Sequence, residues 1–329
     1  MKRKYFGMIL GVVFLASSIL LLTKVYAQEP GVGYVSFNSD QTGNHDIYII
    51  NTNGKNLRNL TDHPAKDFSA TWAPDGRSFA YVADRDGNYE IYVMDLSQRE
   101  TRRLTNHLAR DSNPAWSPDG QWIAFESNRE EGYHIYKMNI RGEKLQQLTN
   151  KGQFNSGPAW SPDGKHIAFN SNRDTSHGIY VMKSNGKRLR KLRTGNGANP
   201  AWSPNGKQIV FSEARDRILK NHALFIVNLD GSGLRQLTND PRFHHQPAWS
   251  PDGEWIAYIL WQGRGRGTDV HVINLAGKPI QRLTNDGVNK YFPKWVPEGF
   301  LTVSPIAQTQ TTLWSRLKKS GSDYSKTRK

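Results

Sequence analysis

The chain has 329 residues and no cysteine, which excludes disulfides, thiol catalysis and cysteine-ligated metal sites. Its formal net charge of +15 is divided into +4 over the first 27 residues, +5 from Ser315 onward and +6 over everything between. Because this central charge is spread rather than gathered into a basic stripe with interleaved aromatics, we expect no nucleic-acid partner.

The N-terminal segment 1–27 has the pattern of an export signal. Basic residues at positions 2–4 precede an apolar run from Met8 to Leu22, and small residues follow up to Ala27. The run has 15 residues, fewer than the roughly 20 that a membrane-spanning helix needs. We therefore expect export to the periplasm or the cell exterior, with cleavage after Ala27. An uncleaved membrane anchor is the alternative.

A tryptophan recurs six times in nearly the same motif, and most copies resemble Pro-Ala-Trp-Ser-Pro-Asp-Gly. The intervals between copies are 42 to 47 residues. The six copies are Trp72, Trp116, Trp160, Trp202, Trp249 and Trp295. A period of this size indicates a repeat protein in which each unit buries its faces against its neighbours. We expect these six rings to pack between adjacent units.

One unit, residues 111–150, shows what each repeat contains. A short segment ends at Trp116, and Ser-Pro-Asp-Gly then forms a turn. Two alternating segments follow, Trp122–Ser127 and Tyr133–Met138, and a fourth begins at Leu145. Four short antiparallel strands in a unit of this length are typical of a propeller blade.

The ends of the repeat pattern predict the number of blades. The pattern begins at Val32 in a second strand and ends at Trp295 in a first strand, so five units are complete. A sixth blade would combine residues 290–295 with residues 32–61, which closes the ring and hides two strand edges. We therefore predict an all-β, six-bladed propeller of four-stranded antiparallel blades over residues 28–304. A basic, flexible tail is expected over residues 305–329.

The segments just before each tryptophan vary from copy to copy, and variable segments on a rigid scaffold commonly bind partners. We expect them at the mouth of the central channel, with acids on one side and basic groups on the other. Such a mouth would suit a peptide or a loop of mixed charge, whereas a solvated rim is the alternative. The candidate residues are Asp67, Phe68, Asp111, Asn113, Asn155, Asn199, His244, His245, Gln246, Lys290 and Tyr291.

No metal site or cofactor is expected. The stretch Asp84-Arg-Asp-Gly lacks the full set of oxygen ligands that calcium needs. His63 and His107 hold equivalent places in adjacent repeats, but the sequence offers no third zinc ligand.

A binding module is favoured over an enzyme. The chain has no Gly-x-Ser-x-Gly motif of a serine hydrolase. Asp67 and Asp111 are the only mouth carboxylates that could act as an acid–base pair. A lyase or glycosidase that uses the channel therefore stays open as the alternative. A second possible contact is an anionic membrane surface, which the basic tail around Leu313 to Lys319 would suit.

The repeat itself resembles the propeller repeat of TolB, the periplasmic protein of the Tol–Pal envelope system. The resemblance covers about residues 31–300 and rests on Pro-Ala-Trp-Ser-Pro-Asp-Gly, Ile-Tyr-Val-Met and the Leu-Thr that ends most units. It implies a monomeric propeller that binds an envelope protein or peptide, with the Pal contact of the family at the channel mouth. A TolA contact is not implied, because the α/β domain of TolB has no counterpart between Gln28 and the first strand.

Overall fold

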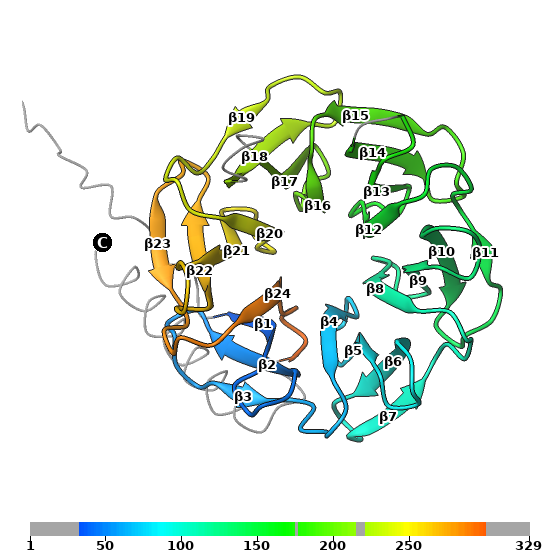
Figure 1. Cartoon of the computed structure of the whole chain (residues 1–329), viewed down its shortest axis with the longest axis horizontal. Helices are drawn as coiled ribbons and strands as arrows, with labels where there is room; N and C mark the ends of the chain where they lie inside the picture. Colours follow the sequence, from blue (N-terminus) through cyan, green and yellow to red (C-terminus); the bar gives the residue numbers. More distant parts are fainter. Residues whose placement is uncertain (1–32, 175–176, 215–220, 301–329) are drawn as a thin grey trace, which may run out of the picture.

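The structure is a computed structural model that describes residues 33–174, 177–214 and 221–300. Its elements are strands, arranged as six four-stranded antiparallel sheets around a central axis (Figure 1). This confirms the predicted six-bladed, all-β propeller. The expected export signal 1–27 and the basic tail 305–329 lie outside the described residues. Within them, no helix is long and apolar enough to cross a membrane.

Each blade is named here from its inner strand to its outer strand. Blade 1 contains β24 (Lys290–Trp295), β1 (Tyr34–Ser39), β2 (Asp46–Asn51) and β3 (Arg58–Asn59). Blade 2 contains β4 (Asp67–Trp72), β5 (Ser78–Ala83), β6 (Glu90–Asp95) and β7 (Glu100–Arg103). Blade 3 contains β8 (Asp111–Trp116), β9 (Trp122–Ser127), β10 (His134–Asn139) and β11 (Gln146–Gln147).

The remaining blades repeat this order. Blade 4 contains β12 (Asn155–Trp160), β13 (His166–Ser171), β14 (Gly178–Lys183) and β15 (Arg190–Thr194). Blade 5 contains β16 (Ala198–Trp202), β17 (Gln208–Ala214), β18 (His222–Asn228) and β19 (Arg235–Gln236). Blade 6 contains β20 (His244–Trp249), β21 (Trp255–Trp261), β22 (Thr268–Asn274) and β23 (Pro279–Arg282).

Blade 1 joins segments from far apart in the sequence. Strand β24 pairs antiparallel with β1, with Trp295 opposite Val35 and Lys290 opposite Ser39. Figure 1 shows the late strand β24 beside the early strands β1 and β2. Because β24 takes the inner place of this blade, β1 has strand partners on both edges.

The core lies between blades rather than within them. Both faces of the second and third strands of a blade are covered by the neighbouring blades. The sequences of β5 and β6 are accordingly apolar over most of their length. Each conserved-motif tryptophan packs on the blade before it: Trp72 of blade 2 lies in one buried cluster with Ile47 and Ile49 of blade 1. Trp202 of blade 5 likewise packs with Ile179 of blade 4. The predicted packing of these rings between blades is confirmed.

Four of the six indoles also donate a hydrogen bond to the preceding blade. Trp72 donates to the Ser36 hydroxyl at 2.8 Å, and the other three donate to the carbonyl oxygen of an alanine. These three pairs are Trp160 to Ala115 at 3.0 Å, Trp202 to Ala159 at 3.0 Å and Trp295 to Ala248 at 3.1 Å. The buried indole nitrogen of Trp249 has no such partner. The blades are therefore joined by directed bonds as well as by apolar contact.

The two faces of the ring differ in their connections. Ser-Pro-Asp-Gly turns and the turns after the third strands lie at one end of the strands, which we call the turn face. In one such turn the Ser117 hydroxyl donates to Asp119 and accepts from the Trp122 N–H, and Gly120 takes a φ of 72°. The loops after the second strands and the crossings between blades lie at the other end, which we call the loop face.

The matched tryptophans allow a test of the bond between blades. Trp202→Phe and Trp249→Phe remove similar buried ring area, but only Trp202→Phe loses a hydrogen bond, the one to the Ala159 carbonyl oxygen. We expect the free energy of unfolding to fall for both variants, and by about 1 kcal/mol more for Trp202→Phe. Urea titration measures the difference. Equal losses would show that the bond contributes nothing to stability.

Candidate functional site on the loop face and in the channel

All six inner strands carry the same irregularity three residues before the tryptophan. The residue there has a positive φ of 48° to 61°, and the strand pairing shifts beside it. These six residues are Ser69, Asn113, Gly157, Asn199, Gln246 and Phe292. Proline follows all but Ser69, and the bulges line a narrow central cavity of about 60 Å³. We call this constriction the channel waist.

The structure separates the eleven predicted mouth residues into two groups. Six reach a surface: Asn113, Asn199 and Gln246 line the waist, whereas Phe68, His245 and Tyr291 are partly exposed one residue earlier in their strands. The other five are fully buried at the start of the inner strands. These are Asp67, Asp111, Asn155, His244 and Lys290.

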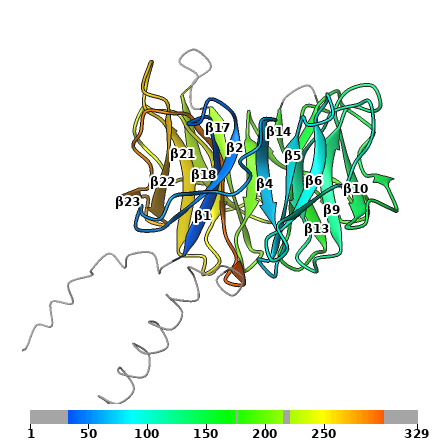
Figure 2. The ribbon, with the colours of Figure 1, turned by 90° about the horizontal axis from the view of Figure 1, so that it is seen from below.

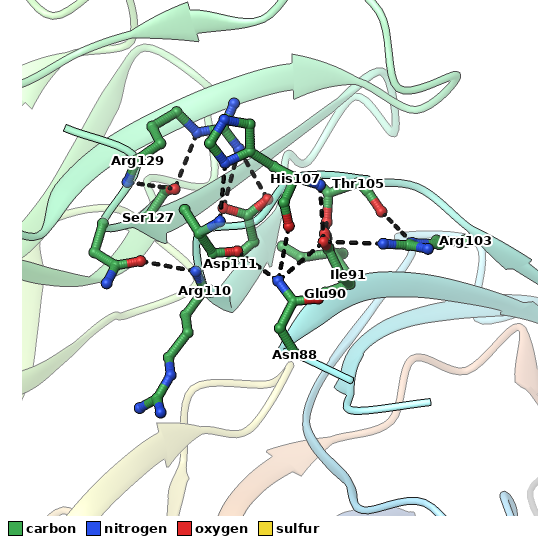
Figure 3. Close-up of polar contacts among 12 residues, drawn as sticks. Asn88, Glu90, Ile91, Arg103, Thr105, His107, Arg110, Asp111, Ser127 and Arg129 are labelled. Carbon is green, nitrogen blue, oxygen red and sulfur yellow. Dashed lines mark hydrogen bonds and ion pairs between the residues drawn. The ribbon is translucent and has the colours of Figure 1, made fainter. Parts of the chain in front are cut away.

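Asp111 shows why the second group is buried. Its carboxylate accepts two hydrogen bonds from the Arg129 guanidinium, at 2.8 and 3.0 Å, and Arg129 also donates to the Ser127 hydroxyl (Figure 3). The guanidinium lies over the Tyr136 ring, 4.9 Å from its centroid. Burial raises the pKa of Asp111, and the Ser127 and Arg129 contacts oppose that rise. The acid is therefore held within its own blade and does not face the channel.

The same arrangement recurs around the ring. Asp67 pairs with Arg85 at 2.7 Å, and Asn155 accepts from Arg173 at 2.9 Å. In blades 1 and 6, the Lys290 ammonium pairs with Asp286 at 2.6 Å, and the His244 Nε2 atom lies 2.9 Å from the Asp240 carboxylate. The structure does not show the expected dipolar mouth, because each of these charged groups is paired with a residue close to its own strand.

A second polar cluster fixes the crossing from blade 2 to blade 3. The buried Glu90 carboxylate accepts from the Thr105 hydroxyl, from the His107 N–H at 2.8 Å and from Arg103 at 3.0 Å. The Asn88 side chain donates to the carbonyl oxygens of His107 and Ala109, at 2.7 and 2.8 Å (Figure 3). Both backbone groups of His107 are therefore held, and its Nδ1 accepts from the Ala109 N–H at 3.0 Å.

This fixed crossing carries the most exposed large apolar side chain among the described residues. Leu108 lies between the two anchored residues His107 and Ala109 and is 99% exposed. Two residues further on, the Arg110 guanidinium lies over the Tyr89 ring, 5.4 Å from its centroid. The Tyr89 ring in turn meets the Phe68 ring edge to face, with 5.1 Å between their centroids. An apolar and aromatic strip thus extends from the channel mouth to the crossing.

Aromatic contacts occur elsewhere on the loop face as well. Phe243, which precedes β20, stacks on His222 at 5.5 Å and meets Trp261 edge to face at 5.3 Å. Tyr133 and Phe154 meet at 5.9 Å between blades 3 and 4. Sequence reasoning missed these residues because it stopped five positions before each tryptophan, whereas Phe154 and Phe243 stand at the sixth.

His245 lies beside this aromatic group and is uncharged at neutral pH. Burial, together with the neighbouring His222 and His244, lowers the pKa of His245 to about 4. A partner would therefore meet a neutral imidazole at this point of the mouth.

The shifted pKa of His245 predicts a pH dependence of stability. Because the folded pKa of about 4 lies below the usual histidine pKa of 6.5, the unfolded chain binds more protons as the pH falls below 6.5. Stability present at pH 7 is then lost toward pH 4. Between pH 7 and 5 we expect His245→Gln to lose on the order of 1–2 kcal/mol less than the native chain. Denaturant titrations at both pH values, with the exposed His177→Gln as control, measure this; parallel losses in all three proteins would contradict it.

Within the described part of the chain, no three His, Cys, Asp or Glu side chains come together in an arrangement that could hold a metal ion. His63 and His107, considered above as possible ligands, instead accept hydrogen bonds from the N–H groups of Ala65 and Ala109.

Comparison with known proteins identifies propellers that are similar to this one. A family model described as the TolB beta propeller domain, PD40, matches residues 85–220 and 187–323. TolB from Acinetobacter baumannii aligns in structure with a TM-score of 0.71 at 23% identity, over 82% of this chain and 68% of that one. A putative TolB from Agrobacterium tumefaciens gives 0.64 at 20% identity, over 82% and 100%. No curated protein sequence matches significantly.

A more distant neighbour is an enzyme. Oligogalacturonate lyase in complex with manganese aligns with a TM-score of 0.56 at 15% identity, over 77% of this chain and 74% of that one. Structural similarity at such low identity carries the fold and not the activity.

Proposed function

The chain belongs to the TolB β-propeller family, and we propose that it is an exported, non-catalytic module that binds a cell-envelope protein or peptide on its loop face. The family match supports a propeller that works by protein binding. The signal-like segment 1–27 and the periplasmic location of TolB support the envelope as its site. Recovery of the protein in the cytosol after cell fractionation would contradict that placement.

One observation carries the binding proposal: Leu108 is fully exposed on a crossing that does not move freely. Its neighbours are held by Glu90 and Asn88 through both N–H and carbonyl groups. An exposed leucine on a rigid support gains apolar burial when a partner covers it, and little ordering entropy has to be lost.

The surroundings of Leu108 fit a protein partner. Arg110, Tyr89 and Phe68 continue the strip toward the mouth, and aromatic and arginine side chains are the residues that contribute most to protein interfaces. Around the mouth, Tyr291 of the neighbouring blade 1 and His245 of blade 6 are partly exposed and extend the available surface. The buried ion pairs below would hold this surface in place without contacting the partner.

Affinity capture from envelope extract tests the proposal. Leu108→Ala is expected to reduce the amount of captured partner at least tenfold, since a buried leucine anchor is worth about 1.5–3 kcal/mol. Leu145→Ala is the matched control, because Leu145 is also exposed but lies in the turn after a third strand. Tyr291→Ala in blade 1 and His245→Ala in blade 6 should also weaken capture. Equal capture by all variants would contradict the proposal.

A carbohydrate-active enzyme is the second candidate, and the fold similarity to oligogalacturonate lyase favours it. Its acid–base pair would be Asp67 and Asp111, but each is buried against an arginine of its own blade. We expect no cleavage when the protein is incubated with oligogalacturonate and a panel of other polysaccharides. Cleavage that is lost in Asp67→Asn or Asp111→Asn would establish the enzyme instead.

A further inference from the structure

The channel waist contains one residue that breaks the repeat. At the position just before the tryptophan, five blades have threonine or alanine, whereas blade 1 has Lys294. The lysine is one of the residues that line the waist cavity. No other described residue of that lining carries a charge. A cation has therefore been placed where the rest of the ring has small side chains.

The Lys294 side chain has neither a hydrogen-bond nor an ion-pair partner among the described residues, in contrast to Lys290 four residues earlier, which pairs with Asp286. Burial lowers the pKa of Lys294, and no carboxylate opposes that shift. A buried ammonium without a counterion either gives up its proton or takes an anion as its partner.

Two side-chain amides of the channel waist, those of Gln246 and Asn199, have NH₂ groups that are available as donors to the cavity. The Gln246 Oε1 atom accepts from the Phe292 N–H at 2.9 Å, which fixes the amide and leaves its NH₂ group without a partner in the described part of the chain. Asn199 is held less firmly. The Ser212 hydroxyl donates to the Ala198 carbonyl oxygen at 3.1 Å and lies 3.4 Å from the Asn199 Oδ1 atom, and no described residue accepts from the Asn199 NH₂ group. The amide oxygens of both residues therefore face the protein, and their NH₂ groups remain available to a ligand in the cavity.

Glu126 of β9 lies outside the lining of the waist cavity. It accepts from the Ser112 hydroxyl and the Gly157 N–H, both at 3.0 Å, and Asn113 also bonds to it. These partners belong to blades 3 and 4, and no ion pair joins Glu126 to Lys294 of blade 1. The cavity of about 60 Å³ has room for about two water molecules or one group the size of a carboxylate.

We propose that the channel waist is a binding site for a small oxyanion, a carboxylate above all, held by the Lys294 ammonium with the amide groups of Gln246 and Asn199 as donors. The site is separate from the loop-face strip and does not depend on the proposed function. A carboxylate can arrive as a free anion or as part of a partner's side chain, and the two sources are separable by experiment.

Thermal unfolding at constant ionic strength tests the site, with acetate and inorganic phosphate as probes and chloride as the reference salt. A ligand that binds only the folded state raises Tm in a saturable way. We expect such a rise for the native chain and for Lys278→Met, which removes an exposed lysine. Lys294→Met should weaken the apparent affinity for acetate at least tenfold. Equal responses in the native chain and Lys294→Met would overturn the proposal.

A second variant covers the case in which Lys294→Met does not fold. Gln246→Glu keeps an acceptor for the Phe292 N–H but replaces the donor by a carboxylate that would itself pair with Lys294. It should abolish the acetate response, and an undiminished response would overturn the proposal. Capture from envelope extract then identifies the source: loss of capture in Lys294→Met assigns the carboxylate to a protein partner, whereas unchanged capture assigns it to a free anion.

Discussion

The structure depends on one constraint, which is that no blade covers its own faces. Each motif tryptophan packs on the preceding blade, and four of the six indoles also donate a hydrogen bond to it. A row of such units would leave one face bare at each end. The pairing of β24 with β1 removes both ends and makes a ring in which every blade supports the next. Side by side in Figure 2, the blades form a short cylinder whose two rims carry the connections.

In this rigid ring, the buried charged groups of the loop face hold backbone segments in place. Buried carboxylates such as Glu90 and Asp111 hold the crossings and the inner strands, and their partners are residues of the same blade or the next loop. A buried carboxylate with several donors fixes backbone that would otherwise be mobile. Among the exposed residues of this face that the structure describes, Leu108 and Phe154 are the large apolar ones, and Leu108 is the extreme case. The crossing that carries Leu108 thus combines a polar support with an apolar contact point.

Much of the fold could be predicted from the sequence, since the tryptophan period and the unfinished first and last units indicate six blades. The site was less accessible. Alternation along a strand places residues on faces only while the pairing stays regular, and every inner strand bulges three residues before its tryptophan. The expectation that Asp67 and Lys290 face a partner was made from position alone and did not consider the arginine or aspartate that buries each of them.

Two features were visible in the sequence but went unused. The spacing of 18 residues between Asp111 and Arg129 recurs between Asp67 and Arg85, and it indicates an ion pair within each blade. Lys294 departs from the alanine or threonine of the other copies. By contrast, nothing in the sequence marks Leu108 as exposed, because its exposure follows from the hydrogen bonds that hold its neighbours.

The most direct test of a binding loop face is site-specific photo-crosslinking in living cells. A photoreactive residue at position 108 would replace the exposed leucine of the crossing, and one at position 145 would replace the exposed leucine of a turn after a third strand. A discrete crosslinked product from position 108 and none from position 145 is the result we predict. Products from position 145 alone, or from neither position, would contradict the assignment of partner binding to this face.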